Sequence, residues 1–207
     1  LRDAEPFRGS ARPQETAGKT LAAASVRPAV LTNWRREMRS IARVYNPAVA
    51  ALEPGAPFPS IPLRDAKGAS VPPPDRDTLY VVFKTTCPTC EFTWPYLERL
   101  RKAAGPGLRI LAVSQDDPET AAAFNRRLGS QVETVYDPKP WPASDRLGVD
   151  AVPTFFRVNP EGRIAETAVG FSRDHMEGFA RHAAKTSGRP YANLFRPEEQ
   201  IPSTKAG

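Results

Sequence analysis

The sequence predicts an α/β protein with a central mixed β-sheet and helices on both of its faces. Short apolar runs alternate along the 207 residues with segments of helical periodicity. The apolar runs are 79–83, 108–113 and 131–136, and the helical segments are 88–104 and 116–128. A strand–helix–strand order requires parallel strands joined by a right-handed crossover. Two further apolar runs follow Pro153 and are joined by Asn159-Pro160-Glu161-Gly162, which predicts an antiparallel hairpin at the edge of the same sheet.

The chain divides into three parts by composition. Residues 1–50 are an N-terminal extension with one amphipathic helix at 33–45, either a packing helix or one that binds a partner. Residues 51–186 form the α/β domain, which opens with a Pro-rich hairpin over residues 61–71. Residues 187–207 are a Pro-rich tail with Tyr191 and Phe195 as candidate anchors.

Local signals mark the ends of the predicted helices. Pro95 lies inside the first helix and predicts a kink there. Acidic residues open the helix that begins near Asp116, as the helix dipole prefers. A short helical turn is predicted at 144–147, and Ser172 is placed to cap a last helix. Met176, Phe179 and Ala183 share one face of that last helix, which predicts that this face is buried.

The chain's two cysteines, Cys87 and Cys90, follow the first apolar strand directly and open the first helix. This spacing lets two sulfurs form and break a disulfide with little movement of the backbone. The N-terminus of a helix favours the thiolate form of the first cysteine. Two cysteines cannot make a disulfide framework, so the pair is expected to be catalytic, metal-binding or incidental.

Composition narrows the function classes further. The net charge is +6 and the sequence pI is about 9.6, but the arginines are scattered and no aromatic-interleaved basic motif occurs. A nucleic-acid partner is therefore not expected. No run of about 18 apolar residues exists, so no membrane span is expected. The chain begins at Leu1, which suggests removal of a signal or anchor and a periplasmic or otherwise extracytoplasmic location in a bacterium.

Several motifs in the same order carry a family resemblance. Cys87-Pro88-Thr89-Cys90 follows the first core strand, and Pro95 lies five residues beyond. Val152-Pro153-Thr154 precedes the hairpin, whose turn carries Asn159-Pro160-Glu161-Gly162-Arg163. Over roughly residues 54–184 the chain resembles the thioredoxin fold, and most closely the TlpA-like thiol-disulfide oxidoreductases, which are related to the redoxins of the AhpC/TSA type.

The resemblance implies a site and a mechanism. Cys87 would attack a substrate disulfide, and Cys90 would resolve the mixed disulfide. Pro153 would be in the cis conformation and lie against the sulfurs, with Val152 offering main-chain hydrogen bonds to an extended substrate. The set of substrate-binding candidates is Thr86, Pro88, Thr89, Trp141, Val152 and Pro153. No cofactor or metal is implied, and the expected partners are protein thiol or disulfide substrates and an unidentified redox partner.

The chain departs from the family at three positions that tune the thiols. Thr86 stands where thioredoxins usually carry Trp. Val81 and Thr93 stand at the two places where relatives carry a buried Asp or Glu. A carboxylate that could deprotonate the second thiol is therefore missing from both usual places.

Other interpretations of the cysteines remain open at the level of sequence. A peroxiredoxin-like thiol peroxidase is one, although Lys84 and Tyr80 stand where that family needs Thr and Pro. A zinc or copper carrier could combine the cysteines with His175 and His182, whose spacing is wider than usual for a metal site. A purely structural disulfide is the third.

Overall fold

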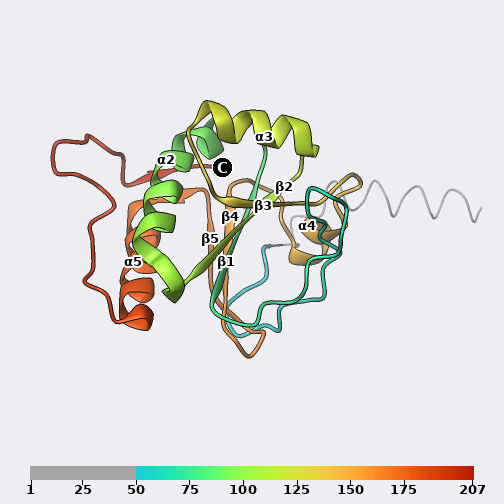
Figure 1. Cartoon of the computed structure of the whole chain (residues 1–207), viewed down its shortest axis with the longest axis horizontal. Helices are drawn as coiled ribbons and strands as arrows, with labels where there is room; N and C mark the ends of the chain where they lie inside the picture. Colours follow the sequence, from blue (N-terminus) through green and yellow to red (C-terminus); the bar gives the residue numbers. More distant parts are fainter. Residues whose placement is uncertain (1–49) are drawn as a thin grey trace, which may run out of the picture. The chain divides into compact units, whose positions relative to one another are not determined.

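The computed structural model describes residues 50–207, and a five-stranded mixed sheet forms its centre (Figure 1). The strands are β1 (Thr78–Phe83), β2 (Arg109–Ser114), β3 (Glu133–Tyr136), β4 (Thr154–Val158) and β5 (Ile164–Val169), and their order in the sheet is β3-β2-β1-β4-β5. β1, β2 and β3 run parallel, while β4 pairs antiparallel with β1 and β5 antiparallel with β4. The predicted parallel unit and edge hairpin are confirmed.

Helices cover both faces of this sheet. They are α2 (Pro88–Ala104), α3 (Pro118–Arg127), α4 (Pro142–Leu147) and α5 (Arg173–Ser187), with a short 3-10 turn η1 (Gly105–Gly107) after α2. β1 divides its side chains between the faces, because successive residues of a strand point to opposite sides. Val81 and Phe83 pack with α2, α3 and α5, whereas Tyr80 and Val82 pack with α4 and residues 51–71. The predicted α/β class is therefore confirmed.

The predicted opening hairpin is present, but it is shorter than a pair of strands. Only single bridges form, between Arg64 and Ser70 and between Arg64 and Tyr136 of β3. The turn itself exists, since the carboxylate of Asp65 accepts hydrogen bonds from the backbone N–H groups of Lys67 and Ala69, each at 2.8 Å. Prolines at both ends of the segment remove donors that a longer ladder needs.

The predicted helix boundaries hold with small shifts. α2 passes through Pro95 as one continuous element. The hydroxyl of Ser172 caps α5 by accepting a hydrogen bond from the N–H of His175. On α5, the side chains of Met176, Phe179 and Ala183 are all buried, as their spacing predicted.

The C-terminal segment folds back onto the domain. Phe195 is buried, as predicted, and contacts Tyr96 of α2, with 4.9 Å between the ring centroids. Tyr191 is 40% exposed, but its hydroxyl donates a hydrogen bond to the carboxylate of Glu177 on α5, so it anchors the segment at the surface. Leu194, beside Phe195, is buried. A two-residue strand β7 (Thr204–Lys205) then pairs with β6 (Phe171–Ser172). The chain ends beside the N-terminal end of α2 (Figure 1).

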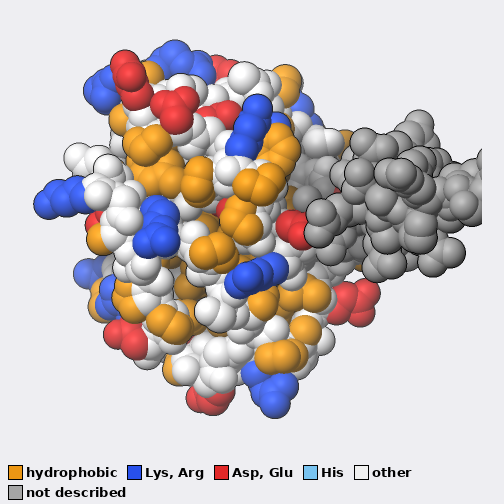
Figure 2. All heavy atoms as spheres, turned by 90° about the vertical axis from the view of Figure 1, so that its right-hand side faces the viewer, with side chains coloured by type: hydrophobic (Ala, Val, Ile, Leu, Met, Phe, Trp, Pro, Cys, Tyr) orange, Lys and Arg blue, Asp and Glu red, His pale blue; other side chains and the backbone are white. Residues whose placement is uncertain are grey.

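The predicted N-terminal helix at 33–45, like residues 1–49 as a whole, lies outside the described residues. Within residues 50–207, no helix is both long and apolar enough to cross a membrane. On the face turned toward the viewer in Figure 2, Lys and Arg side chains form separate groups among apolar and uncharged ones. The positive charge on that face is thus dispersed, as the scattered arginines predicted.

Candidate active site

Cys87 lies at the junction of β1 and α2. A turn brings its N–H to the carbonyl of Lys84 at 3.2 Å, and Cys87 then serves as the N-cap of α2. Its sulfur accepts a hydrogen bond from the N–H of Cys90 at 3.2 Å. Pro88 occupies the first helical position, where the missing N–H costs no helical hydrogen bond. This N-terminal N–H and the helix dipole both stabilise negative charge on the sulfur of Cys87.

The loop before β4 completes the surroundings of Cys87. The Val152–Pro153 peptide bond is cis, as expected from the resemblance. The thiol of Cys87 donates a hydrogen bond to the carbonyl oxygen of Val152 at 3.2 Å. Cys87 is partly exposed while Pro153 is buried. One side of the sulfur therefore faces main chain, while the Cys87 side chain keeps part of its surface exposed.

Cys90 has the opposite environment. Its side chain is fully buried within the core formed by α2, α3 and α5. Burial raises the pKa of the Cys90 thiol well above its ordinary value, and its hydrogen bond with Cys87 raises the pKa further. Both cysteines are present as free thiols. The pair thus combines an accessible sulfur at the helix cap with a buried thiol that holds its proton.

A carboxylate near the pair comes from a place that the sequence analysis missed. Asp116 follows β2, and its Oδ2 atom accepts a hydrogen bond from the N–H of Thr85 at 2.7 Å. The negative charge of Asp116 also contributes to raising the pKa of Cys90. The predicted absence of a carboxylate at positions 81 and 93 is confirmed, since Val81 and Thr93 have uncharged and fully buried side chains. Asp116 therefore supplies a charge that those two positions do not.

Asp116 was noticed in the sequence, but a different role was predicted for it. Both Asp116 and Asp117 were interpreted as the acidic start of a helix. In the structure, Asp117 alone caps α3, with its carboxylate accepting hydrogen bonds from the N–H and the hydroxyl of Thr120. Asp116 faces the other way because the parallel strands β1 and β2 end at the same edge of the sheet.

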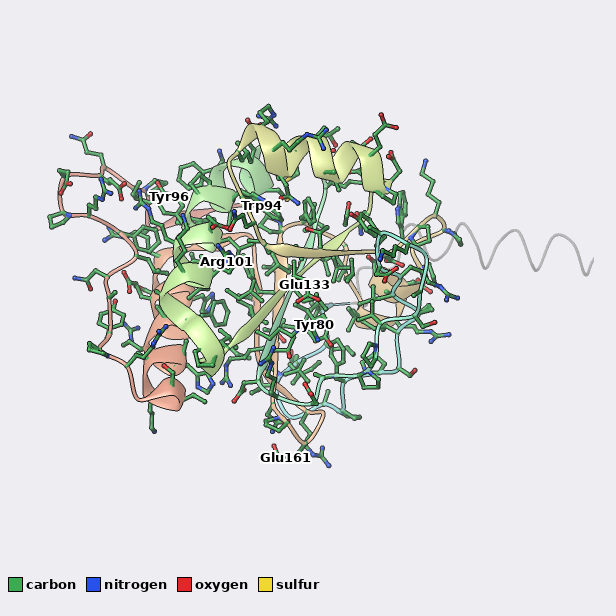
Figure 3. All side chains as sticks on the ribbon, viewed as in Figure 1. Tyr80, Trp94, Tyr96, Arg101, Glu133 and Glu161 are labelled. Carbon is green, nitrogen blue, oxygen red and sulfur yellow. The ribbon has the colours of Figure 1, made fainter. Side chains whose placement is uncertain are left out.

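The two tryptophans near the cysteines have different positions. Trp94 is fully buried in α2, and its indole N–H donates a hydrogen bond to Asn125 at 2.7 Å (Figure 3). Trp141 is only partly buried, and its indole N–H donates to the carbonyl of Gln115 at 2.9 Å. The ammonium of Lys84 lies 4.5 Å from the centre of the Trp141 ring. Trp141 thus lies against the turn that carries Cys87, whereas Trp94 belongs to the core.

The remaining candidates are divided between surface and interior. Thr86 and Pro88 are exposed beside Cys87. Thr89 is buried, and its hydroxyl donates a hydrogen bond of 2.6 Å to the carbonyl of Ala206 in the C-terminal segment. The contact between Thr89 and Ala206 was not predicted, since no sequence motif in residues 203–207 indicates that they lie near the cysteines.

Other features of the described residues lie apart from the cysteines. No group of three or more His, Cys, Asp and Glu side chains in residues 50–207 could hold a metal ion. His182 lies 3.3 Å from the carboxylate of Asp77. A cavity of about 350 Å³ opens beside Phe58 and Tyr80, and none of its lining residues belongs to the surroundings of Cys87 (Figure 3).

Comparison with known proteins agrees with this geometry. The model of the AhpC/TSA family matches residues 54–167. The thiol-disulfide oxidoreductase ResA of Bacillus subtilis is 25% identical over an alignment of 169 residues, gaps included, that covers 75% of this chain and 85% of ResA. A Chlorobium tepidum protein assigned as the thiol:disulfide interchange protein DsbE has a similar structure, with a TM-score of 0.54 at 21% identity, and the match covers 66% of this chain and 99% of that one.

A peroxiredoxin-like protein from Aquifex aeolicus is also similar in structure. Its TM-score is 0.53 at 15% identity, and the match covers 64% of this chain and 89% of that one. The fold is therefore thioredoxin-like, with a pair of cysteines at the site where the first helix begins. The chain belongs to the AhpC/TSA family, and the resemblance to thiol-disulfide oxidoreductases is confirmed at low identity.

Proposed function

We propose that this protein exchanges the Cys87–Cys90 pair between dithiol and disulfide with protein substrates. The observation that carries the proposal is the contrast between the two sulfurs. Cys87 is accessible and receives the N–H of Cys90, while Cys90 is buried with a raised pKa. An accessible thiolate can attack a substrate disulfide. A buried neighbouring thiol that keeps its proton stays unreactive until a mixed disulfide has formed.

The proposed reaction balances two electrons and two protons. The thiolate of Cys87 attacks one sulfur of a substrate disulfide, and the other substrate sulfur leaves as a thiolate that takes up a proton. Cys90 then loses its proton and attacks the Cys87 sulfur, which breaks the mixed disulfide and releases the second substrate thiol. The protein is left with a Cys87–Cys90 disulfide, and a separate dithiol partner must reduce it for another cycle.

Val152 and Trp141 are the proposed substrate contacts. An extended chain could use the main chain of Val152, whose carbonyl already accepts the Cys87 thiol hydrogen. Trp141 and Lys84 offer a flat aromatic face and a positive charge beside the same turn. The proposed set also retains Thr86, Pro88, Thr89 and Pro153. A Trp141→Leu variant should raise KM for a protein substrate more than it lowers kcat.

The primary test is reduction of insulin disulfides by the purified protein with a chemical reductant. Cys87→Ser should abolish turnover, whereas Cys90→Ser should accumulate a covalent mixed disulfide on Cys87. Absence of both disulfide reduction and dithiol oxidation by the wild type would refute the proposal. Rapid consumption of peroxide by the reduced protein would point instead to the peroxidase chemistry that other redoxins perform.

We also propose that this chemistry takes place outside the cytoplasm. Protein disulfides, the proposed substrates, form and persist mainly in oxidising compartments. Fractionation of cells that express the full-length protein, followed by thiol labelling, tests this location. Recovery of the protein in the cytoplasmic fraction alone would contradict it.

A further inference from the structure

The last residues of the chain run extended past the active site. β7 pairs antiparallel with β6, with Lys205 opposite Phe171 and Thr204 opposite Ser172. The N–H of Arg173 donates to the carbonyl of Ser203 at 2.9 Å, which continues the same pairing. β7 thus comprises two residues, and the chain continues from it through residues 206–207 toward the N-terminal end of α2 (Figure 1). Residues 203–207 are called the C-terminal strand below.

The two residues that follow β7 contact two of the proposed substrate-binding residues. The hydroxyl of Thr89 donates to the carbonyl of Ala206 at 2.6 Å. Gly207 lies so close to Val152 that a Cβ atom on Gly207 would be 2.8 Å from the Val152 carbonyl oxygen. That oxygen is the one that accepts the thiol hydrogen of Cys87. The chain's own backbone thus occupies the space beside the attacking sulfur.

The strand and the domain approach each other closely through their backbones. Gly170 has a φ of +73°, and a Cβ atom there would lie 2.6 Å from the carbonyl oxygen of Lys205. The ammonium of Lys205 lies 4.9 Å from the centre of the Phe92 ring. Contacts this close leave no room for a Cβ atom at Gly170 or Gly207, so this surface accepts an extended polypeptide only with small residues at these points, as Gly207 is.

The strand has firm anchors upstream and weak contacts at its end. Arg99 donates hydrogen bonds to both carboxylate oxygens of Glu199, at 2.8 and 2.6 Å, and one of 2.9 Å to the carbonyl of Leu194. Leu194 and Phe195 are buried. Beyond Ile201, the strand is held by the Arg173–Ser203 hydrogen bond, the two-residue pairing of β6 and β7, and the contacts of Lys205 with Phe92 and of Ala206 with the Thr89 hydroxyl, and most of its residues are exposed. Segments with few buried contacts open locally without unfolding the domain, so residues 203–207 can leave while the anchors stay.

We propose that residues 203–207 are an internal occupant of the substrate groove and compete with protein substrates for the contacts of Thr89, Val152 and Gly170. The proposal rests on the function proposed above, because it assigns the occupant of that same site. In this arrangement a substrate polypeptide gains access to Cys87 only when the strand has moved out. The strand therefore lowers the reactivity of Cys87 toward poor substrates and small thiol reagents.

The test compares the full chain with a variant that ends after Ser203. The rate of Cys87 alkylation by iodoacetamide should rise about tenfold in the truncated protein, a factor equivalent to one or two net hydrogen bonds. KM for insulin should fall in the same variant. Lys185→Ala, which removes an exposed lysine on α5, is the control for the lost charge of Lys205 and should leave both values unchanged.

A second variant tests the proposal in the full chain, in case the truncated chain misfolds. Lys205→Pro in the full chain removes the N–H that pairing with Phe171 requires, and it should also speed alkylation. A synthetic peptide of residues 201–207 added to the truncated protein should slow alkylation again. Equal alkylation rates in the full chain, the truncated protein and Lys205→Pro would overturn the proposal. Alkylation needs no turnover, so this result is independent of whether insulin is reduced.

Discussion

The buried thiol of Cys90 should make the folded protein lose stability at alkaline pH. Burial is the main cause of the raised pKa of Cys90 in the folded state. In the unfolded chain a cysteine ionises with a pKa of about 8.5. The stabilisation from this proton is therefore fully present below about pH 8.5 and is lost as the pH rises toward the folded value.

The size of the effect follows from proton linkage. While the unfolded chain is ionised and folded Cys90 is not, the free energy of unfolding falls by about 1.4 kcal/mol per pH unit. Between pH 9 and pH 10.5 the loss amounts to about 2 kcal/mol, which is a large part of a typical domain's stability. Tyr80 titrates later, because burial raises its pKa to about 12.

Urea unfolding of the reduced protein at several pH values measures this loss. In Cys90→Ala, the free energy of unfolding should fall between pH 9 and pH 10.5 with a slope that is shallower by about 1.4 kcal/mol per pH unit. The smaller side chain also lowers the free energy of unfolding, but by an amount that does not depend on pH. Cys87→Ala is the matched control and should retain the slope, since it removes the accessible thiol. Parallel curves for the wild type and Cys90→Ala would refute the reasoning, because Cys90 would then ionise equally easily in both states.

Three further changes test separate parts of the structure. Asp116→Asn should lower the pH at which Cys90 becomes reactive to alkylation, because the carboxylate raises the pKa of Cys90; an unchanged pH profile would contradict the placement of that charge. Trp94→Phe should reduce the free energy of unfolding in urea by about 1–3 kcal/mol, since it leaves the partly buried amide oxygen of Asn125 without its indole donor. A change below about 0.5 kcal/mol would be inconsistent with this partner. Glu199→Gln should speed hydrogen exchange in the C-terminal segment through loss of the ion pair with its arginine partner, and identical exchange would show that the anchor lies elsewhere.

Much of the fold was accessible from the sequence because its signals are local. The alternation of apolar runs and helical periodicity predicted the parallel unit and the hairpin, and Ser172 predicted the start of α5. The predicted hairpin over residues 61–71 is present with a single antiparallel bridge, since the prolines around it prevent a longer ladder. Tyr191 and Phe195 both anchor the tail, but only the structure places Phe195 in the core and Tyr191 at the surface of α5, because an aromatic residue in a tail does not reveal which surface it meets.

The site was predictable only in part, for a related reason. The spacing of Cys87 and Cys90 and their place after a strand are local properties, and they predicted a capped, accessible sulfur and a second thiol behind it. The contact of Cys87 with Val152 required the family resemblance, because 65 residues separate the two in the sequence. Asp116 was visible in the sequence, but only the shared edge of β1 and β2 turns it toward the cysteines.

The sequence by itself determined the two reactive sulfurs, the helix that begins between them and the class of sheet around them, because neighbouring residues encode each of these. Tertiary structure decided which charge acts on Cys90 and what lies beside Cys87. The hydrogen bond from Thr89 to Ala206 joins residues 117 positions apart, and neither has a local pattern that requires the other. Contacts of this kind arise when the folded sheet and helices bring distant segments together, and the proposed occlusion of Cys87 rests on them.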